Sequence, residues 1–286
     1  MLYVKGQLLH INEVRPKDDI EEVILYRLHE DPTNHSYSSL RELQVELTLR
    51  KHIILSARAL NFSRAQFADF RDAFCNPRYW QLTKEGGFLQ RSDVSSSDAI
   101  EDIFVNSYSY AFECATAIMI LFYHAILNTI GRDAFHFHFQ RLLLYSWHHD
   151  DDLGMTTENV SHFIPGDVVY FNNPDVNPAQ LHWRGENAVL LEDNTYYGHG
   201  VSIQTKEEMI AILNEERIPG STQSAYLMDF ATRLSARQIT SLQTPKRKPQ
   251  RRERLIPHRE PSISSKQYPG GAGPGSVRWN RPRSTR

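Results

Sequence analysis

The stretch YSYAFECATAIMILFYHAIL, residues 108–127, contains the longest apolar run of the chain, from Ala115 to Leu127. A helix this long and this apolar is typical of the core of a protein. The run is too short for the roughly 20 apolar residues of a membrane span, and His124 interrupts it. We therefore predict a buried helix, with Glu113 and Cys114 at its start, and no membrane contact.

The charge of the 286-residue chain is distributed unevenly. The chain holds 32 Lys and Arg and 34 Asp and Glu, but twelve basic and only two acidic residues follow Gln243. This last segment is rich in Pro and Gly and has almost no aliphatic residues, so it cannot bury enough surface to offset its ordering entropy. We predict one globular domain at 1–242 and a disordered basic tail at 243–286. The tail either binds an acidic surface or only adds solubility.

The two cysteines, Cys75 and Cys114, cannot form a disulfide framework in a chain of this length, which favours a reducing compartment. The N-terminus alternates like a strand and lacks the apolar region and small-residue cleavage site of a signal peptide. We therefore expect the protein to be made and kept reduced inside the cell.

Helical patterns dominate the first half of the chain and strand patterns the second. Apolar spacing and caps predict helices over 18–30, 38–61, 63–74, 95–107 and 205–220. Strands are predicted in the first ten residues, in a hairpin over 78–91, at 139–147 and 165–174, in a second hairpin over 186–203 and at 224–235. The fold class is α+β, with an antiparallel sheet packed on the buried helix.

Cys114 has the position of a nucleophile. Unpaired N–H groups and the helix dipole at a helix start can lower the pKa of a thiol, although a free cysteine is more often a small core hydrophobe. Glu113 would instead raise the pKa of that thiol. The pair makes sense if the thiol and the carboxyl share one proton. Alternatively, Glu113 is a solvated acid at the helix start.

Two candidate partners lie on the second predicted hairpin. With a turn at Asp193 and Asn194, residues whose numbers add to about 387 pair, so Glu186 and His199 fall close together at one end. In papain-like enzymes the base follows the cysteine in sequence and lies on a strand facing its helix. These residues could form a site with Cys114. The alternative for His199 is a histidine in a surface loop.

The segment SWHHDDDLG, residues 146–154, could suggest a metal, but adjacent ligands on an extended segment point to opposite faces. No zinc motif, phosphate-binding loop or dinucleotide fingerprint accompanies it. We therefore expect no metal and no cofactor. Trp147 and Trp183 either wall a narrow cleft or pack in the core.

Several long motifs resemble one known family. YAFECATAIMILFY, LLLYSWHHDDDL, PGDVVYFNNPDVNP and WRGENAVLLEDNTYYGHG are similar to the small transglutaminases of Bacillus-type spore formers, the protein-glutamine gamma-glutamyltransferases of the spore coat. The resemblance runs from about residue 5 to about 238. It implies an NlpC/P60-like, papain-related core with extra N-terminal helices. It also implies a nucleophile at Cys114, a partner carboxylate at Glu186, a histidine at His199, and partial substitution for Glu186 by Glu113.

The resemblance further implies the reaction: a glutamine γ-carboxamide acylates Cys114 with release of ammonia, and a lysine ε-amine resolves the thioester into an isopeptide crosslink. Glu186 would carry the proton, and an apolar tunnel lined by Trp147 and Trp183 would keep water out. Spore coat proteins would be the substrates of a monomeric enzyme made in the mother cell and moved to the coat. We expect no nucleic-acid partner.

Two other functions remain compatible with these residues. An NlpC/P60-type peptidase acting on cell-wall peptides would use the same cysteine, but neither an export signal nor a wall-binding repeat is present. A non-enzymatic coat assembly protein could bind through the basic tail. The sequence leaves open which of Glu113, Glu186 and His199 is the base.

Overall fold

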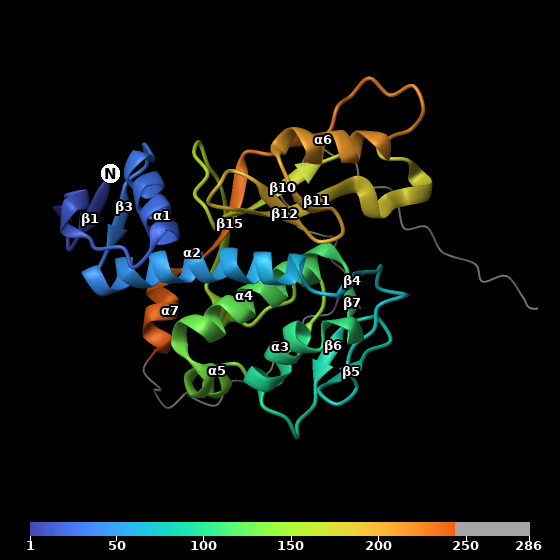
Figure 1. Cartoon of the computed structure of the whole chain (residues 1–286), viewed down its shortest axis with the longest axis horizontal. Coiled ribbons are helices and arrows are strands. Elements are labelled where there is room, and N and C mark those ends of the chain that lie inside the picture. Colours follow the sequence, from blue (N-terminus) through green and yellow to red (C-terminus); the bar gives the residue numbers. More distant parts are fainter. Residues whose placement is uncertain (244–286) are drawn as a thin grey trace, which may run out of the picture. The chain divides into compact units, whose positions relative to one another are not determined.

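The computed structural model describes residues 1–243, so the predicted disordered tail lies outside the described residues except for Gln243. Helices dominate the first half of this part and the strands of one large sheet the second, which confirms the α+β class (Figure 1). The α-helices are α1 (Asp19–Glu30), α2 (Leu40–Asn61), α3 (Ser96–Val105), α4 (Cys114–Ile130), α5 (Arg132–His138), α6 (Lys206–Glu215) and α7 (Ala236–Leu242). None of the helices in residues 1–243 has the length and apolar character to cross a bilayer.

Helix α4 is the buried helix that the apolar run predicts, and it begins at Cys114 with Glu113 as its cap, as expected. The residues before it form a 3₁₀ turn, Ser107–Ser109, and a short strand, β7 (Ala111–Phe112). The side chain of Glu113 caps the first turn, and Gly131, at φ +85°, ends the helix. Because the cap falls directly before the cysteine, Cys114 occupies the first helical position.

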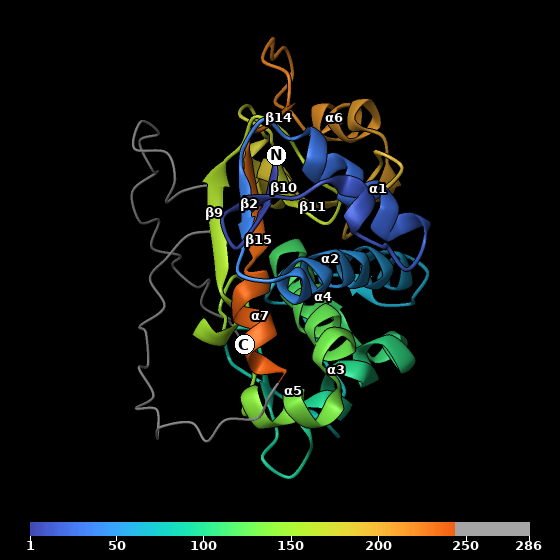
Figure 2. The same cartoon turned by 90° about the vertical axis from the view of Figure 1, so that its left-hand side faces the viewer.

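The large sheet is antiparallel throughout, with the strand order β13-β12-β11-β10-β15-β9 and β14 paired to β10. Its strands are β9 (Met155–Asn159), β10 (Val168–Asn172), β11 (Gly185–Leu190), β12 (Tyr196–Gly198), β13 (Ser202–Gln204), β14 (Tyr226–Leu227) and β15 (Phe230–Leu234). Figure 2 shows β9 beside β15 and α7 following it.

Residues 188–191, the end of β11 and the residue after it, alternate between two hydrophobic clusters. Val189 and Leu191 belong to the main core with α2 and α4, whereas Ala188 and Leu190 belong to a second cluster with Met209 of α6. Both α2 and α4 contact β11. The sheet is therefore packed on the central helix, as predicted, and α6 covers its other face (Figure 1).

Three smaller sheets accompany the large one in the described residues, and two of these have three strands. The predicted hairpin over 78–91 forms from β5 and β6, and β8 adds to it. At the N-terminus, β1 pairs with β2 on one side and with β3 on the other. The strands are β1 (Leu2–Val4), β2 (Gln7–Leu8), β3 (His35–Tyr37), β5 (Trp80–Leu82), β6 (Phe88–Gln90) and β8 (Leu143–Leu144). The strand expected over 139–147 is thus only two residues long.

The helix predicted over 63–74 is wrong. The side chain of Asp69 accepts hydrogen bonds from the backbone N–H groups of Arg71 and Asp72, which turns the chain locally. Residues Gln66–Phe67 form β4 instead, parallel to β7. This pairing brings the end of α2 to the chain that leads into Cys114. Helices α5 and α7 and strand β9 were not predicted.

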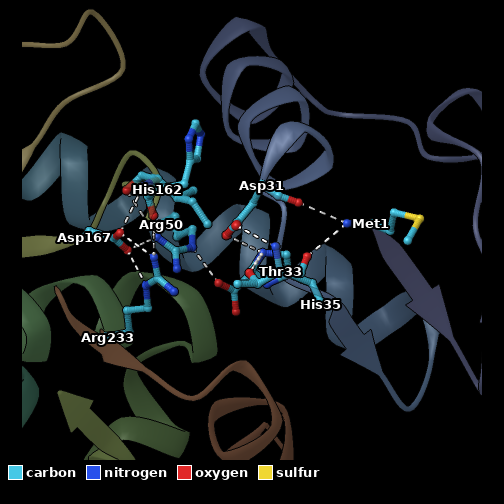
Figure 3. A network of polar contacts seen from close by, with 10 residues as sticks. Met1, Asp31, Thr33, His35, Arg50, His162, Asp167 and Arg233 are labelled. Carbon is cyan, nitrogen blue, oxygen red and sulfur yellow. Dashed lines mark hydrogen bonds and ion pairs between the residues drawn. The ribbon is translucent and has the colours of Figure 1, made fainter. Parts of the chain in front are cut away.

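A buried ion-pair network joins α2 to the large sheet (Figure 3). Arg50 of α2 donates to Asp167 at 2.8 Å and to Glu46 at 2.5 Å, and Arg233 of β15 donates to both oxygens of Asp167 at 2.7 Å. The backbone N–H of Ile164 also donates to Asp167. Burial alone would raise the pKa of Asp167, but the charges of Arg50 and Arg233 outweigh it and lower that pKa. The network fixes the helix on the sheet without leaving a charge unpaired.

Candidate active site

Glu113 is bound tightly to the start of α4. Its Oε2 accepts from the backbone N–H of Ala115 at 2.7 Å, and its Oε1 accepts from the N–H and Oγ1 of Thr116 at 2.6 and 2.7 Å. Burial raises the pKa of Glu113, while these bonds and the Cys114 thiol act in the opposite direction. Glu113 is therefore a helix cap whose carboxylate also reaches the cysteine, and not a solvated acid.

The sulfur of Cys114 lies between helix and sheet. The side-chain Nδ2 of Asn187 on β11 donates to Sγ across 3.4 Å, and Asn187 is only 5 % exposed. Burial, and then the charges of Glu186 and Glu113, raise the pKa of the Cys114 thiol well above its usual range. The side-chain and backbone N–H groups of Asn187 oppose this rise.

The expectation that the helix start lowers the pKa of Cys114 is therefore wrong. A helix dipole supplies about half a charge, whereas two carboxylates and a buried setting act against the thiolate. The other possibility that the sequence offered, a thiol and a carboxyl that share a proton, fits this direction.

Glu186 is a buried carboxylate with few hydrogen-bond partners. It is 3 % exposed, and its Oε1 has no hydrogen-bond partner among residues 1–243. Burial, and then the charge of Glu113, raise the pKa of Glu186 well above its usual range, while the backbone N–H of His199 acts in the opposite direction. Since the charges of Glu186 and Cys114 act on each other, the structure brings these two side chains into one site.

Strands β11 and β12 bring Glu186 and His199 together, one residue from the expected register. Ala188 pairs with Gly198, and continuing that register puts Asn187, rather than Glu186, opposite His199. Asn194, at φ +63°, forms part of the predicted turn.

His199 is buried rather than in a surface loop, and its ring makes contacts away from the sulfur. Its Nδ1 lies 3.1 Å from the Tyr197 hydroxyl, its Nε2 lies 3.1 Å from the carbonyl oxygen of Gln66, and the ring stacks on Phe112 at 4.5 Å. Burial lowers the pKa of His199 to about 4, although the Gln66 and Phe112 carbonyls favour the charged form. The ring is therefore neutral near pH 7, donates through Nε2–H to Gln66 and accepts from Tyr197.

The two candidate tunnel tryptophans pack against different hydrophobic clusters. Trp147 packs against the main core, and the N–H of its neighbour Ser146 donates to Thr116 Oγ1 at 2.9 Å. Trp183 packs against the second cluster and precedes Glu186 by three residues. Among residues 1–243, no hydrogen bond or ring contact joins the two tryptophans.

The segment with His148, His149 and three aspartates does not gather ligands. His149 Nδ1 lies 2.8 Å from the Trp147 carbonyl oxygen, and Asp150 accepts from the backbone N–H of Asp152. In the part of the chain that the structure describes, no three His, Cys, Asp or Glu side chains come close enough to hold a metal ion.

The most informative residue that sequence reasoning missed is Asn187. Its only sequence signal is its place directly after Glu186 in GENAV, and side chains that follow one another on a strand normally point to opposite faces. The contact with Cys114 becomes visible only when α4 is packed against β11.

The known proteins to which this chain is similar are transglutaminases. Residues 1–243 match the family model for protein-glutamine gamma-glutamyltransferase. A protein-glutamine gamma-glutamyltransferase of Halalkalibacterium halodurans is 46 % identical over 94 % of this chain and 95 % of its own length. One of Bacillus mycoides is 42 % identical over 92 % of this chain and 96 % of its own. A solved transglutaminase from Geobacillus stearothermophilus, without its C-terminal extension, is 47 % identical with a TM-score of 0.69 over 72 % of this chain and 99 % of that one.

Proteins of this name transfer the γ-glutamyl group of a protein-bound glutamine to an amine, so they are acyltransferases with protein substrates. The matches span nearly the whole of the relatives, and they do not favour a cell-wall peptidase. The chain belongs to the protein-glutamine gamma-glutamyltransferase family and crosslinks proteins by transglutamination.

Proposed function

We propose that Cys114 is the nucleophile of this transglutaminase and that Glu186 carries its protons. The observation that carries the proposal is a half-buried thiol at the first position of a buried helix, enclosed by two carboxylates and one amide. No other cysteine fits, because burial alone raises the pKa of Cys75 to about 12 and no carboxylate acts on its thiol.

In the first half-reaction Sγ of Cys114 attacks the γ-carboxamide carbon of a glutamine, and the thiol proton passes to Glu186. The C–S bond forms, Glu186 returns the proton to the departing nitrogen, and ammonia leaves. A lysine ε-amine then attacks the thioester, its proton passes to Glu186, and the C–S bond breaks. Cys114 recovers the proton, so the enzyme is regenerated and one isopeptide bond remains.

The hydrogen bonds distinguish the two carboxylates. Glu113 is occupied by the backbone and side chain of its own helix, whereas Oε1 of Glu186 has no hydrogen-bond partner within residues 1–243. A raised pKa near a nucleophile suits a group that must accept and then return a proton. Glu113 positions the helix start and can replace Glu186 in part, because it also reaches the thiol.

His199 supports this site as a positioning residue. Its neutral ring connects β12 to the Gln66 carbonyl oxygen and packs on Phe112, directly before the cap of α4. Its backbone N–H favours the charged form of Glu186 and so opposes the rise of that pKa. Loss of the ring would loosen the contact between the hairpin and the helix start.

Trp147 and Trp183 form the walls of the substrate passage in this proposal. Trp147 follows Ser146, whose N–H binds Thr116 in the first turn of α4, and Trp183 precedes Glu186 by three residues. Apolar walls limit water, which would otherwise hydrolyse the thioester. We further propose spore coat proteins as substrates, synthesis in the mother cell followed by transfer to the coat, a monomeric enzyme and a papain-related core.

The test follows ammonia release and incorporation of a primary amine into a glutamine-bearing protein. The wild type should do both and Cys114→Ala neither, while Cys75→Ala serves as the matched control and should remain active. Glu186→Gln should reduce the rate by about 100-fold or more, as expected for removal of a proton carrier. Activity in Cys114→Ala would end this proposal.

A further inference from the structure

We propose that Asn187 is a catalytic residue: its side-chain amide holds Sγ of Cys114 for attack and then binds the oxyanion that develops on the substrate carbonyl. The inference rests on the proposed role of Cys114 as nucleophile. Its basis is the 3.4 Å contact from Nδ2 to Sγ, made by a side chain that is 5 % exposed and fixed on a central strand.

A second hydrogen-bond donor lies on the cysteine itself. In the first turn of α4, the N–H groups of Ala115 and Thr116 bind Glu113, and that of Ala117 binds the Glu113 carbonyl oxygen. Within residues 1–243, only the N–H of Cys114 in this turn has no acceptor. Two donors, Cys114 N–H and Asn187 Nδ2, therefore flank the sulfur from helix and sheet, as stabilisation of a tetrahedral oxyanion requires.

The charges around the sulfur explain why a neutral amide is needed. Glu113 and Glu186 both make negative charge at Cys114 unfavourable, and Asn187 is the neighbour whose N–H groups favour it. A cation would also favour negative charge, but it would pair with Glu186 and hold its proton-accepting oxygens. An amide stabilises developing charge and leaves the carboxylate free.

A purely structural role accounts poorly for this contact. Thiol sulfur is a weak hydrogen-bond acceptor, so a buried amide whose Nδ2 faces it gains little stability in the free enzyme. The contact becomes valuable when the neighbouring acceptor is an oxyanion, because charge-assisted hydrogen bonds are roughly twice as strong as neutral ones. The donor is thus placed for the transition state rather than for the resting protein.

The experiment compares Asn187→Ala and Asn187→Asp with wild type, using a glutamine peptide and a primary amine. Asn187→Ala should lower kcat by about 100- to 1,000-fold with only a small change in KM. Asn187→Asp keeps the size of the side chain but should be at least as impaired, because it adds a third carboxylate. The matched control is Asn172→Ala, a sheet asparagine whose Nδ2 contacts Tyr226 at 3.3 Å.

A second readout does not depend on transfer. The pH profile for alkylation of Cys114 by iodoacetamide should move to higher pH in both Asn187 variants and stay unchanged in Asn172→Ala. A folded Asn187→Ala or Asn187→Asp with kcat within threefold of wild type, or a loss of thermal stability with an unchanged alkylation profile, would overturn the proposal. Activity in Cys114→Ala would instead overturn the nucleophile assignment, so the two failures differ.

Discussion

Gly198 and Glu186 are in direct contact across β11 and β12. A Cβ atom on Gly198 would lie 2.8 Å from both Cγ and Oε1 of Glu186 and 2.6 Å from Cγ2 of Val201. The absence of a side chain at one strand position therefore provides the space that the carboxylate of the next strand occupies.

Substitution Gly198→Ala should displace Glu186 and reduce amine incorporation by about 10- to 100-fold, since misplacement of a catalytic group by 1 Å can cost this much. Overpacking should also lower the free energy of unfolding by about 1–3 kcal/mol. Both are measured by steady-state kinetics and chemical denaturation. Gly220→Ala, where a Cβ would meet nothing within 4 Å at φ +83°, controls for backbone strain. Equal activity in the two variants would contradict the prediction that a side chain at position 198 displaces Glu186.

Substitutions of the two carboxylates of the site should affect the stability of the protein differently. Glu113→Ala removes the cap of α4 and should cost about 1 kcal/mol of unfolding free energy. Glu186→Gln should cost none. Because the folded-state pKa of Glu186 is raised, its contribution to stability is present below its unfolded pKa and is lost as pH rises, so Glu186→Gln should be the more stable protein at pH 8. Denaturant unfolding at pH 5 and pH 8 measures both effects, and a less stable Glu186→Gln at pH 8 would refute the assignment.

Two half-buried histidines, His52 and His124, should make the protein acid-sensitive. Burial lowers the pKa of His52 and of His124 to about 4; His52 Nδ1 contacts Thr129 Oγ1 at 2.9 Å and His124 Nδ1 contacts Ser56 Oγ at 2.7 Å. Since both pKa values are depressed from 6.5, the stability these rings contribute is complete above pH 6.5 and is lost as pH falls through about 4. In His124→Gln the loss between pH 7 and pH 4 should be smaller by about 1–2 kcal/mol. An unchanged acid-unfolding curve would contradict the prediction.

Arg50 should matter far more than a surface arginine with a similar bond. Arg50→Gln leaves Asp167 and Glu46 short of a cation in a buried site and should cost about 3–5 kcal/mol. Arg91→Gln breaks an exposed pair with Asp93 and should leave the free energy of unfolding almost unchanged, because solvent screens such pairs. Thermal and denaturant unfolding of the two variants measure the difference. Similar losses of unfolding free energy in both would refute the prediction.

Local chemistry made much of this fold predictable. Ser39 caps α2, Thr205 and Glu208 form a reciprocal capping box at α6, and the hairpin at Asn194 follows from turn residues. These interactions lie within a few residues of one another, so the sequence displays them directly. The helix predicted over 63–74 failed because its apolar spacing competes with the Asp69 turn and with pairing to β7, more than 40 residues away.

The candidate site was predictable in its members but not in its electrostatics. A cysteine at a helix start and a carboxylate on a later strand can be found from spacing. The pKa of Cys114 cannot, because burial and the charge of Glu186 arise only when α4 packs on β11. Asn187 could not be identified from the sequence for the same reason, since its role depends on which face of a strand meets the sulfur.

The raised pKa of the Cys114 thiol has a consequence for how long the enzyme lasts. Peroxide attacks thiolates far faster than protonated thiols. A cysteine that loses its proton only during attack on the substrate should therefore be oxidised slowly while no substrate is bound. An enzyme arranged in this way should keep its nucleophile unoxidised until a substrate binds.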